Sequence, residues 1–536
     1  MKKFLSTLLL ILPLTQVFAQ EQNAGTVNVS QPQKQWYEGE LFLQNIRFGS
    51  QNPVSITSNP YSQLNDFSIS YSMNKGSFMP VDGAGKSGMT DVNIYGVRKV
   101  KNISFEGSLY YGVHQLDDSR WNSTVLLSEN NPFIIADSLV YYKKATHEDS
   151  IPNNQSRELF NLNGGFSWQT GKLTTALRAN YLVGNKADQS DPRFKANGAR
   201  VTFNPGIEYN VFNNIYIGLS ATYQVYHENI GMSAKDHLFP GHQSTFFLQE
   251  LGNYIVEQSC SRRYDGTKVG GDIQFVYSGS KFSDILEVGY ITNNENADDG
   301  GTSYTKHGGD YSESTLSFRN RFQIHGDILK HSLTISGGML NGKCKWYKQN
   351  SKKGDFGETL YEVASTEIVQ KQNEMFGDLS YRLDYLNSQR PSVSIVLNGG
   401  YKSVKINEYP DEYFVKYTLT NIGMDLSKYL YFGKLSFKLT ANFDYCKDLT
   451  KLDYSFPTSA GKSKVINSYY IPKYQYLGAG YWNGGLSVDG SYKINRNEQS
   501  SLYVKFGGSY NITKYTGDYS RFQDRNQAEI RTSLYF

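Results

Sequence analysis

The chain has 536 residues with 54 basic and 50 acidic side chains, and 14% of its residues are aromatic although only 39% are hydrophobic. A mean hydropathy of −0.52 is low for a soluble domain of this length, whereas a membrane barrel needs only one apolar face per strand. The near balance of charge gives no support to a nucleic-acid partner. The soluble alternative is a large secreted β-sandwich or propeller.

Residues 1–19 have the pattern of a secretory signal peptide. Lys2 and Lys3 form a short basic region, residues 4–17 are mostly apolar, and Ala19 ends a small-residue cleavage site. No later stretch approaches the roughly 20 apolar residues that a membrane-spanning helix requires. We therefore expect export, a mature chain that begins at Gln20, and a location in the outer membrane of a Gram-negative cell.

Residues 20–65 precede the first strong strand pattern. Residues 20–35 are rich in Gln and Asn and predict a flexible periplasmic tail, whereas residues 36–47 could form a short helix. We interpret the region as a periplasmic N-terminal tail with a candidate plug for the barrel lumen. A periplasmic arm or an added strand is the alternative. Residues 66–536 are expected to form the barrel.

Beyond this tail, segments of about ten residues alternate between apolar and polar side chains, the length that crosses a bilayer as a tilted strand. In one of them Phe437 and Leu439 alternate with Lys438 and Thr440, so one face suits lipid and the other suits water. The pattern predicts eighteen strands, near residues 67–74, 89–99, 103–115, 158–169, 173–184, 198–211, 214–226, 267–278, 281–291, 314–327, 330–344, 374–386, 391–404, 412–427, 432–446, 479–492, 499–512 and 527–536.

The predicted connections alternate between short turns and long polar loops. Residues 101–102 and 428–431 are predicted turns, and residues 292–313 and 345–373 are predicted loops. Short periplasmic turns and long extracellular loops are typical of outer-membrane barrels, with both chain ends on the periplasmic side. The predicted fold class is all-β, a transmembrane antiparallel β-barrel of about 18 strands, within a range of 16–20, with a small N-terminal segment that could plug the lumen.

The polar faces of the predicted strands carry charges of both signs, which we predict to face the lumen. A water-filled lumen would solvate these charges, whereas pairing across neighbouring strands would rigidify the wall and narrow the pore. Mixed signs argue against a strongly ion-selective channel, which needs rings of one sign. The lumen-facing candidates are Glu106, Arg178, Glu287, Arg319, Arg321, Arg382, Asp384, Lys438, Asp444, Lys505, Glu529 and Arg531.

The sequence offers little chemistry beyond these charges. Glu295, Asp298 and Asp299 carry oxygen ligands that suit calcium, but their spacing matches no defined loop. No Ser-His-Asp or paired-carboxylate arrangement rises above chance, so we expect no enzyme activity, no metal and no cofactor.

Two other features allow more than one interpretation. Tyrosines gather near one outer loop, where they could stack on sugars or form an aromatic girdle at the membrane interface, and we favour the girdle for Tyr481 and Trp482. The other members are Tyr469, Tyr470, Tyr474 and Tyr476. At most one disulfide can form, and the sequence does not select its two members from Cys260, Cys344 and Cys446.

The chain ends in an alternating strand whose last residues are Tyr535 and Phe536. A final strand with an aromatic end resembles the signal read by the outer-membrane barrel-insertion machinery, which we expect as a partner. The other expected partners are outer-membrane lipid, lipopolysaccharide, and a protein bound at the extracellular loops or on the periplasmic side. We expect no nucleic acid.

Three segments resemble a family of uncharacterised Gram-negative outer-membrane β-barrel proteins of about this length: Trp121-Asn122, residues 131–138 and residues 189–193. The resemblance covers essentially the whole mature chain, implies fold and location only, and brings no substrate or catalytic residue. Two hypotheses about function follow. The first is a channel or transporter for small solutes, and the second is a structural or accessory barrel that binds a partner in an export, adhesion or nutrient-uptake complex.

Overall fold

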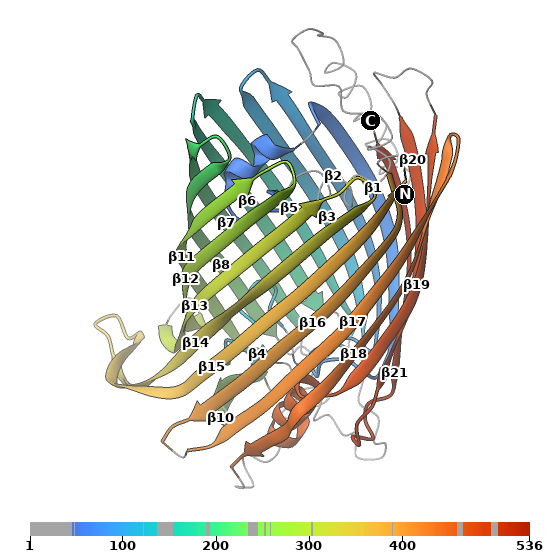
Figure 1. Cartoon of the computed structure of the whole chain (residues 1–536). Helices are drawn as coiled ribbons and strands as arrows, with labels where there is room; N and C mark the ends of the chain where they lie inside the picture. The colour runs from blue at the N-terminus through green and yellow to red at the C-terminus, as the bar shows by residue number, and fades with distance from the viewer. Residues whose placement is uncertain are drawn as a thin grey trace, which may run out of the picture.

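A computed structural model describes residues 46–47, 49–59, 61–119, 121, 123–136, 154–188, 193–233, 245–250, 253–257, 259–301, 304–387, 390–410, 412–457, 465–494 and 502–535. These residues form an 18-stranded antiparallel sheet that closes on itself, because β1 pairs with both β2 and β21 (Figure 1). The predicted signal peptide, most of the predicted tail, and Phe536 lie outside the described residues.

The barrel strands follow one another around the wall in chain order. Their bounds are β1 Gln63–Gly76, β2 Lys86–Val100, β3 Ile103–Asp117, β5 Asn154–Thr170, β6 Leu173–Asp188, β7 Arg193–Phe212, β8 Ile215–Ser233, β11 Ser259–Ser278, β12 Phe282–Gly301, β13 Tyr304–His325, β14 Leu329–Lys353, β15 Thr359–Asn387, β16 Arg390–Glu408, β17 Phe414–Phe432, β18 Leu435–Ser455, β19 Tyr481–Lys493, β20 Tyr503–Tyr515 and β21 Asp524–Tyr535. A separate small sheet joins β4 Ile135–Ala136, β9 Thr245–Glu250 and β10 Asn253–Glu257.

The predicted fold class and the predicted number of strands are confirmed, but several strand ends differ. The segments 292–313 and 345–373, predicted as loops, are mostly strand, because neighbouring strands continue their pairing beyond the alternating region. The turn predicted at residues 428–431 is wrong. β17 continues to Phe432, and the chain turns at Gly433, whose φ of +60° is a conformation that glycine adopts readily.

The two faces of the wall differ in chemistry. Large apolar side chains are exposed along the outer face, where they suit contact with lipid hydrocarbon. Examples are Phe203, Leu219, Phe275, Phe318, Leu379, Met424, Phe443 and Phe506. The alternate residues form a polar inner face. Across the described ranges, the structure contains no helix that is long and apolar enough to cross a membrane.

The barrel has two unlike ends. Short connections such as residues 101–102 and 171–172 define the turn end, at the top of Figure 1, and longer connections define the loop end, at the bottom. Among the residues that the structure describes, three short helices lie off the wall: η3 Pro53–Ser58, η5 Ile466–Tyr470 and α4 Ile471–Leu477. η5 and α4 are continuous, and they fold against the loop end.

Candidate functional site

Residues 46–59, called the N-terminal segment below, are fixed to the inner face of the wall near the turn end. Glu287 accepts hydrogen bonds from the Ser50 hydroxyl at 2.6 Å and from the Gln51 backbone N–H at 2.9 Å. Arg47 forms an ion pair with Glu208 at 2.8 Å. These contacts join the segment to β7 and β12, so part of the inner wall is occupied by chain rather than open.

Asn52 is the most deeply seated residue of the N-terminal segment. Its side-chain amide donates to the backbone carbonyls of Ile207 and Leu219 at 3.1 and 3.2 Å, and it is 1% exposed. It fits there because Gly206 and Gly218 have no side chains, and a Cβ at either position would collide with Asn52. Its carbonyl oxygen also caps η3 by accepting from the Val54 N–H. The predicted plug residues 36–45 lie outside the described residues.

At the loop end, residue 121 and residues 123–134 of the connection after β3 turn back onto the inner wall. The carboxylate of Glu228 accepts the backbone N–H groups of Val125 and Leu126 at 2.6 and 2.8 Å. The carbonyl oxygen of Phe133 accepts from Arg262 and Tyr264 at 2.9 and 2.7 Å. Buried charged and polar groups of the wall therefore hold this connection in one position.

Residues 465–479, which contain η5 and α4, cover the opposite part of the loop end. Val465, Ile466, Tyr469, Tyr470 and Tyr474 share one buried cluster with inner-face residues of β16 and β17. Trp121 belongs to the same cluster, and its ring lies 5.3 Å from that of Tyr469. Residues 121–134 and 465–479 together are called the cover below. Burial raises the pKa of Tyr469 and lowers that of Lys473, as expected where water is excluded.

The tyrosines predicted to form a girdle or a sugar platform divide between two environments. Tyr469, Tyr470 and Tyr474 form the interior of the cover. Tyr476, at the inner side of the cover, and Tyr481 instead line a cavity, so the prediction that Tyr481 belongs to a membrane girdle is wrong. Tyr481 lies on the inner side because it is two residues before Asn483, which lines the same cavity, and alternate residues of a strand share a face.

This cavity, called the amide cavity, has a volume of about 680 Å³ and lies against the inner face of β17 to β21. Five of its lining residues carry a side-chain carboxamide. The carboxamides belong to Asn421, Asn442, Asn483, Asn511 and Gln527. Asp425, Asp444 and Arg525 supply its charges, and Phe78, Tyr476 and Tyr481 supply its rings.

Glycines on the neighbouring strands make room for these polar side chains. Asn442 and Asn511 are the two cross-strand partners of Gly485, and a Cβ there would collide with both side-chain oxygens. Asp444 lies in the same way opposite Gly423. The amides and carboxylates therefore lie flat along the wall and leave the cavity wide.

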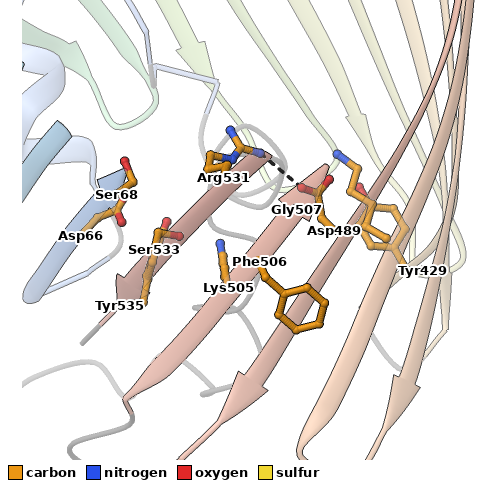
Figure 2. A pocket seen from close by; sticks show the side chains of 11 residues that line it. Asp66, Ser68, Tyr429, Asp489, Lys505, Phe506, Gly507, Arg531, Ser533 and Tyr535 are labelled. Carbon is orange, nitrogen blue, oxygen red and sulfur yellow. Dashed lines mark hydrogen bonds and ion pairs between the residues drawn. The ribbon is translucent and has the colours of Figure 1, made fainter. Parts of the chain in front are cut away.

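A smaller cavity of about 110 Å³ lies nearer the turn end and is called the cationic cavity (Figure 2). Arg531 points toward Asp489, at 3.3 Å, and the Lys505 ammonium lies over the Tyr535 ring, 4.1 Å from its centroid. Lys438 is its third basic residue. The lining thus combines three cations with the carboxylates of Asp66 and Asp489.

The two cavities adjoin along the wall. Thr440 of the amide cavity and Lys438 of the cationic cavity are two residues apart on β18, and Ser487 and Asp489 are equally close on β19. Side chains two residues apart on a strand are neighbours on the same face. A polar strip therefore runs from beneath the cover toward the turn end.

The charged residues predicted from sequence to face the lumen fall into two groups: some form ion pairs within the wall, and others line the two cavities. Three pairs lie within the wall: Arg178 with Glu106 at 2.7 Å, Arg321 with Glu287 at 3.5 Å, and Arg382 with Asp384 at 2.8 Å. Arg319 approaches Glu287 at 3.9 Å and donates to the carbonyl of Gly49 at 3.1 Å. Lys438, Lys505 and Arg531 line the cationic cavity, Asp444 lines the amide cavity, and Glu529 lies on β21 between Gln527 and Arg531.

The carboxamide side chains that line the amide cavity were not identified from the sequence. The available signal was the repeated Asn at inward positions of successive strands, with Gly at nearby inward positions. Asn52 and the contacts of the cover carried no local signal, since they depend on which strands the segments meet.

The acidic residues considered for calcium have protein partners instead. Glu295 accepts from Asn131 at 2.9 Å, Asp298 pairs with Arg263 at 3.1 Å, and Asp299 pairs with Arg262. The part of the chain that the structure describes holds no group of three or more His, Cys, Asp or Glu residues arranged for a metal ion. Cys344 and Cys446 are both buried and form no disulfide among the residues that the structure describes.

A closed antiparallel barrel with an apolar outside and a polar inside matches the fold of Gram-negative outer-membrane proteins. Within that class, the chain belongs to a family of unknown function, DUF6850, whose model matches residues 53–536. A search of curated proteins finds no match to the sequence.

Several solved outer-membrane proteins are similar in fold. The ferric yersiniabactin uptake receptor FyuA from Yersinia pestis is 8% identical with a TM-score of 0.43, over 88% of this chain and 80% of the receptor. The RagAB peptide transporter is 8% identical with a TM-score of 0.40, over 89% of this chain and 87% of that one. The copper transporter OprC is 9% identical with a TM-score of 0.39, over 87% and 80%. Structural similarity with such low sequence identities and TM-scores implies nothing about the function of this chain.

Proposed function

We propose that this chain is an outer-membrane channel or transporter for small polar solutes, and that the cover closes its loop end in the state described here. The single observation that carries the proposal is the polar strip formed by the two adjoining cavities, from beneath the cover toward the turn end. A barrel with only a structural role has no need of an inner face that stays wide and polar beneath a folded cover.

The lining favours small polar solutes over single ions of one sign. The cationic cavity holds both signs of charge, and the amide cavity is mostly neutral. Ion-selective pores rely on rings of one charge sign, and hydrophobic pores rely on apolar linings. The alternation of amide, hydroxyl and mixed charge instead supports the passage of hydrogen-bonding solutes.

The test is conductance in planar bilayers and solute-driven swelling of liposomes. The wild-type barrel is expected to conduct weakly, and the double variant Trp121→Ala, Tyr469→Ala is expected to conduct several times more, because the contact within the cover is lost. The matched control is Trp168→Ala, since Trp168 is 48% exposed on β5, away from the cover. If the double variant migrates as a folded barrel on gels yet neither conducts nor takes up solute, the proposal is overturned.

We also propose that the part of residues 20–65 that precedes β1 acts as a plug at the turn end and that residues 1–19 are removed on export. The hydrogen bonds of the N-terminal segment to β7, β8 and β12 support the first part. Deletion of residues 20–60 is expected to raise conductance further in the double variant, and unchanged conductance would argue against a plug. Mass spectrometry of the mature N-terminus is expected to find Gln20 first.

A second candidate function is the binding of a partner at the loop end. The β14–β15 hairpin supports it, because this hairpin extends past the last pairing of β13 with β14 at Lys345, and Phe356 near its tip is 97% exposed (Figure 1). Capture from intact outer membranes with wild-type and Phe356→Ser barrels tests this function. A partner that is lost with Phe356→Ser would support it, and recovery of the barrel alone in both cases would count against it.

A further inference from the structure

The amide cavity has a lining that suits one chemical class of solute. A side-chain carboxamide offers two N–H donors and an acceptor oxygen, and Asn442, Asn483 and Asn511 present such groups from three successive strands. The Thr513 hydroxyl donates to the side-chain carbonyl oxygen of Asn483 at 3.2 Å. This bond fixes the orientation of the whole Asn483 carboxamide, including its NH2 group. The result is a flat array in which donors and acceptors alternate over short distances.

The charges of the cavity disfavour anionic solutes. Asp425 and Asp444 are both carboxylates, and the one cation of the lining, Arg525, donates to the backbone carbonyls of Gly76 and Ala84 at 3.4 and 3.2 Å. A phosphate or carboxylate would therefore meet two like charges and an arginine that is already engaged. An apolar solute would fare no better, because it would remove water from the amides without replacing the lost hydrogen bonds.

Two partly exposed aromatic rings, Tyr476 of α4 and Tyr481 of β19, line the loop side of the cavity. Both pack on the buried ring of Phe78, with ring centroids 5.1 and 5.4 Å from it. A pyranose ring has hydroxyls around its edge and C–H groups on its face. Its edge suits the alternating donors and acceptors of the amides, and its face suits an aromatic side chain.

We infer that the amide cavity binds a neutral polyhydroxylated solute, a monosaccharide or short oligosaccharide, with its hydroxyls on the carboxamides of β18 to β20 and a sugar face on the rings beneath the cover. The inference rests on the proposed channel function and names its substrate class. The volume of about 680 Å³ lies within the roughly 300–1,000 Å³ usual for ligand sites.

Cys446 provides a direct probe, because it lines the amide cavity. The experiment uses the full chain with the cover-loosening changes Trp121→Ala and Tyr469→Ala and with Cys260→Ser and Cys344→Ser. The rate at which a small methanethiosulfonate reagent modifies Cys446 is measured with glucose, maltotriose, a neutral dipeptide or inorganic phosphate present. Glucose or maltotriose is expected to slow modification several-fold, and the dipeptide and phosphate are expected to leave the rate unchanged.

Amide variants then locate the contact. Asn442→Ala and Asn511→Ala are each expected to weaken the protection by sugar about two- to tenfold, the range for one neutral hydrogen bond. The matched control is Asn163→Ala, which removes a carboxamide bonded to Ser108 on β3, away from this cavity. Sugar-dependent block of the ion current is measured on the same variants and gives a second reading where a variant is modified slowly.

The outcomes separate this inference from the channel proposal. Modification of Cys446 that no sugar slows, or that the dipeptide slows more than either sugar, overturns the inference, and conductance of the cover-loosened barrel would leave the channel standing. Protection by sugar without any conductance would support the binding site and overturn the channel. Protection that Asn163→Ala weakens as much as Asn442→Ala does would also overturn the inference, because the site would then not be the amide cavity.

Discussion

The rings of Trp121 and Tyr469 meet across the loop end of the barrel, with their centroids 5.3 Å apart. Trp121 belongs to the connection after β3, whereas Tyr469 belongs to the connection between β18 and β19. One aromatic contact thus joins two connections that reach the lumen from different parts of the wall.

Trp121→Ala should loosen the cover without unfolding the barrel. Trp121 is 1% exposed, and loss of a buried aromatic side chain typically costs about 3–5 kcal/mol. Because the loss falls on a local unit, hydrogen exchange in residues 465–477 is expected to be at least about tenfold faster, with the strands unchanged. Trp168→Ala is the control, and equal effects of the two changes would contradict a specific role for Trp121.

The cover should close more firmly as pH rises. Burial lowers the pKa of Lys473, although Asp82 and Glu129 oppose this shift, and its ammonium lies 5.5 Å from the Tyr469 ring centroid. Between the lowered pKa and the usual lysine value, the closed cover binds fewer protons than the opened one, so closure gains stability with increasing pH. Wild-type conductance is expected to fall as pH rises toward the usual lysine pKa. Lys473→Met should flatten this profile, and an equally steep fall in that variant would refute the assignment.

Asn52→Ala should release the N-terminal segment. The change removes two hydrogen bonds to the wall and the cap of η3, and the loss of one such hydrogen bond typically costs about 0.5–1.5 kcal/mol. Trypsin is expected to cleave after Arg47 several times faster. Thr57→Ala is a matched control because the Thr57 hydroxyl donates within the segment, to the carbonyl of Val54, and the change leaves the backbone carbonyl that accepts from Lys99 of the wall. Cleavage at the wild-type rate in Asn52→Ala would show that the other contacts of the N-terminal segment hold it on the wall without Asn52.

Gly485→Ala should narrow the amide cavity. The new methyl group would displace the carboxamides of Asn442 and Asn511, whose oxygens occupy its position, toward the lumen. In the cover-loosened barrel, conductance is expected to fall by about half or more. Gly164→Ala is the control, since a Cβ at Gly164 meets nothing within 4 Å. A fall of the same size in the control would indicate general damage to the wall.

Deletion of Phe536 should impair insertion more than activity. The final strand pairs with β1, although Phe536 itself lies outside the described residues. Surface levels in whole cells and conductance per inserted barrel are the two measurements. Normal surface levels of the truncated chain would contradict a role for Phe536 as an insertion signal.

The fold was predictable because each barrel strand carries its own apolar face. Phe437 and Leu439 point to one side whether or not their neighbours are known, so the number of strands follows from local pattern. The strand ends were not predictable in the same way. Beyond the membrane both faces of a hairpin meet water, so residues 345–373 do not alternate even though backbone pairing continues through them.

The site was predictable only in part, because it depends on register. Arg178 and Glu106 could be assigned to the polar face from sequence, but their contact requires that Gly165 of β5 lie between them in the paired sheet. The position of Asn442 opposite Gly485 has the same origin. No local sequence pattern predicts the cover, because Trp121 and Tyr469 come into contact only once the barrel has closed.

The cover also sets an order of events during biogenesis. Residues 465–479 precede β19, β20 and β21, and they meet Trp121, which follows β3, only when β21 pairs with β1 and closes the barrel. A nascent barrel that lacks its last strands therefore has an unsealed mouth, and the final step of assembly both joins the seam and shuts the passage. Cells that accumulate such partly assembled chains should become leaky to external solutes before they lose the mature protein.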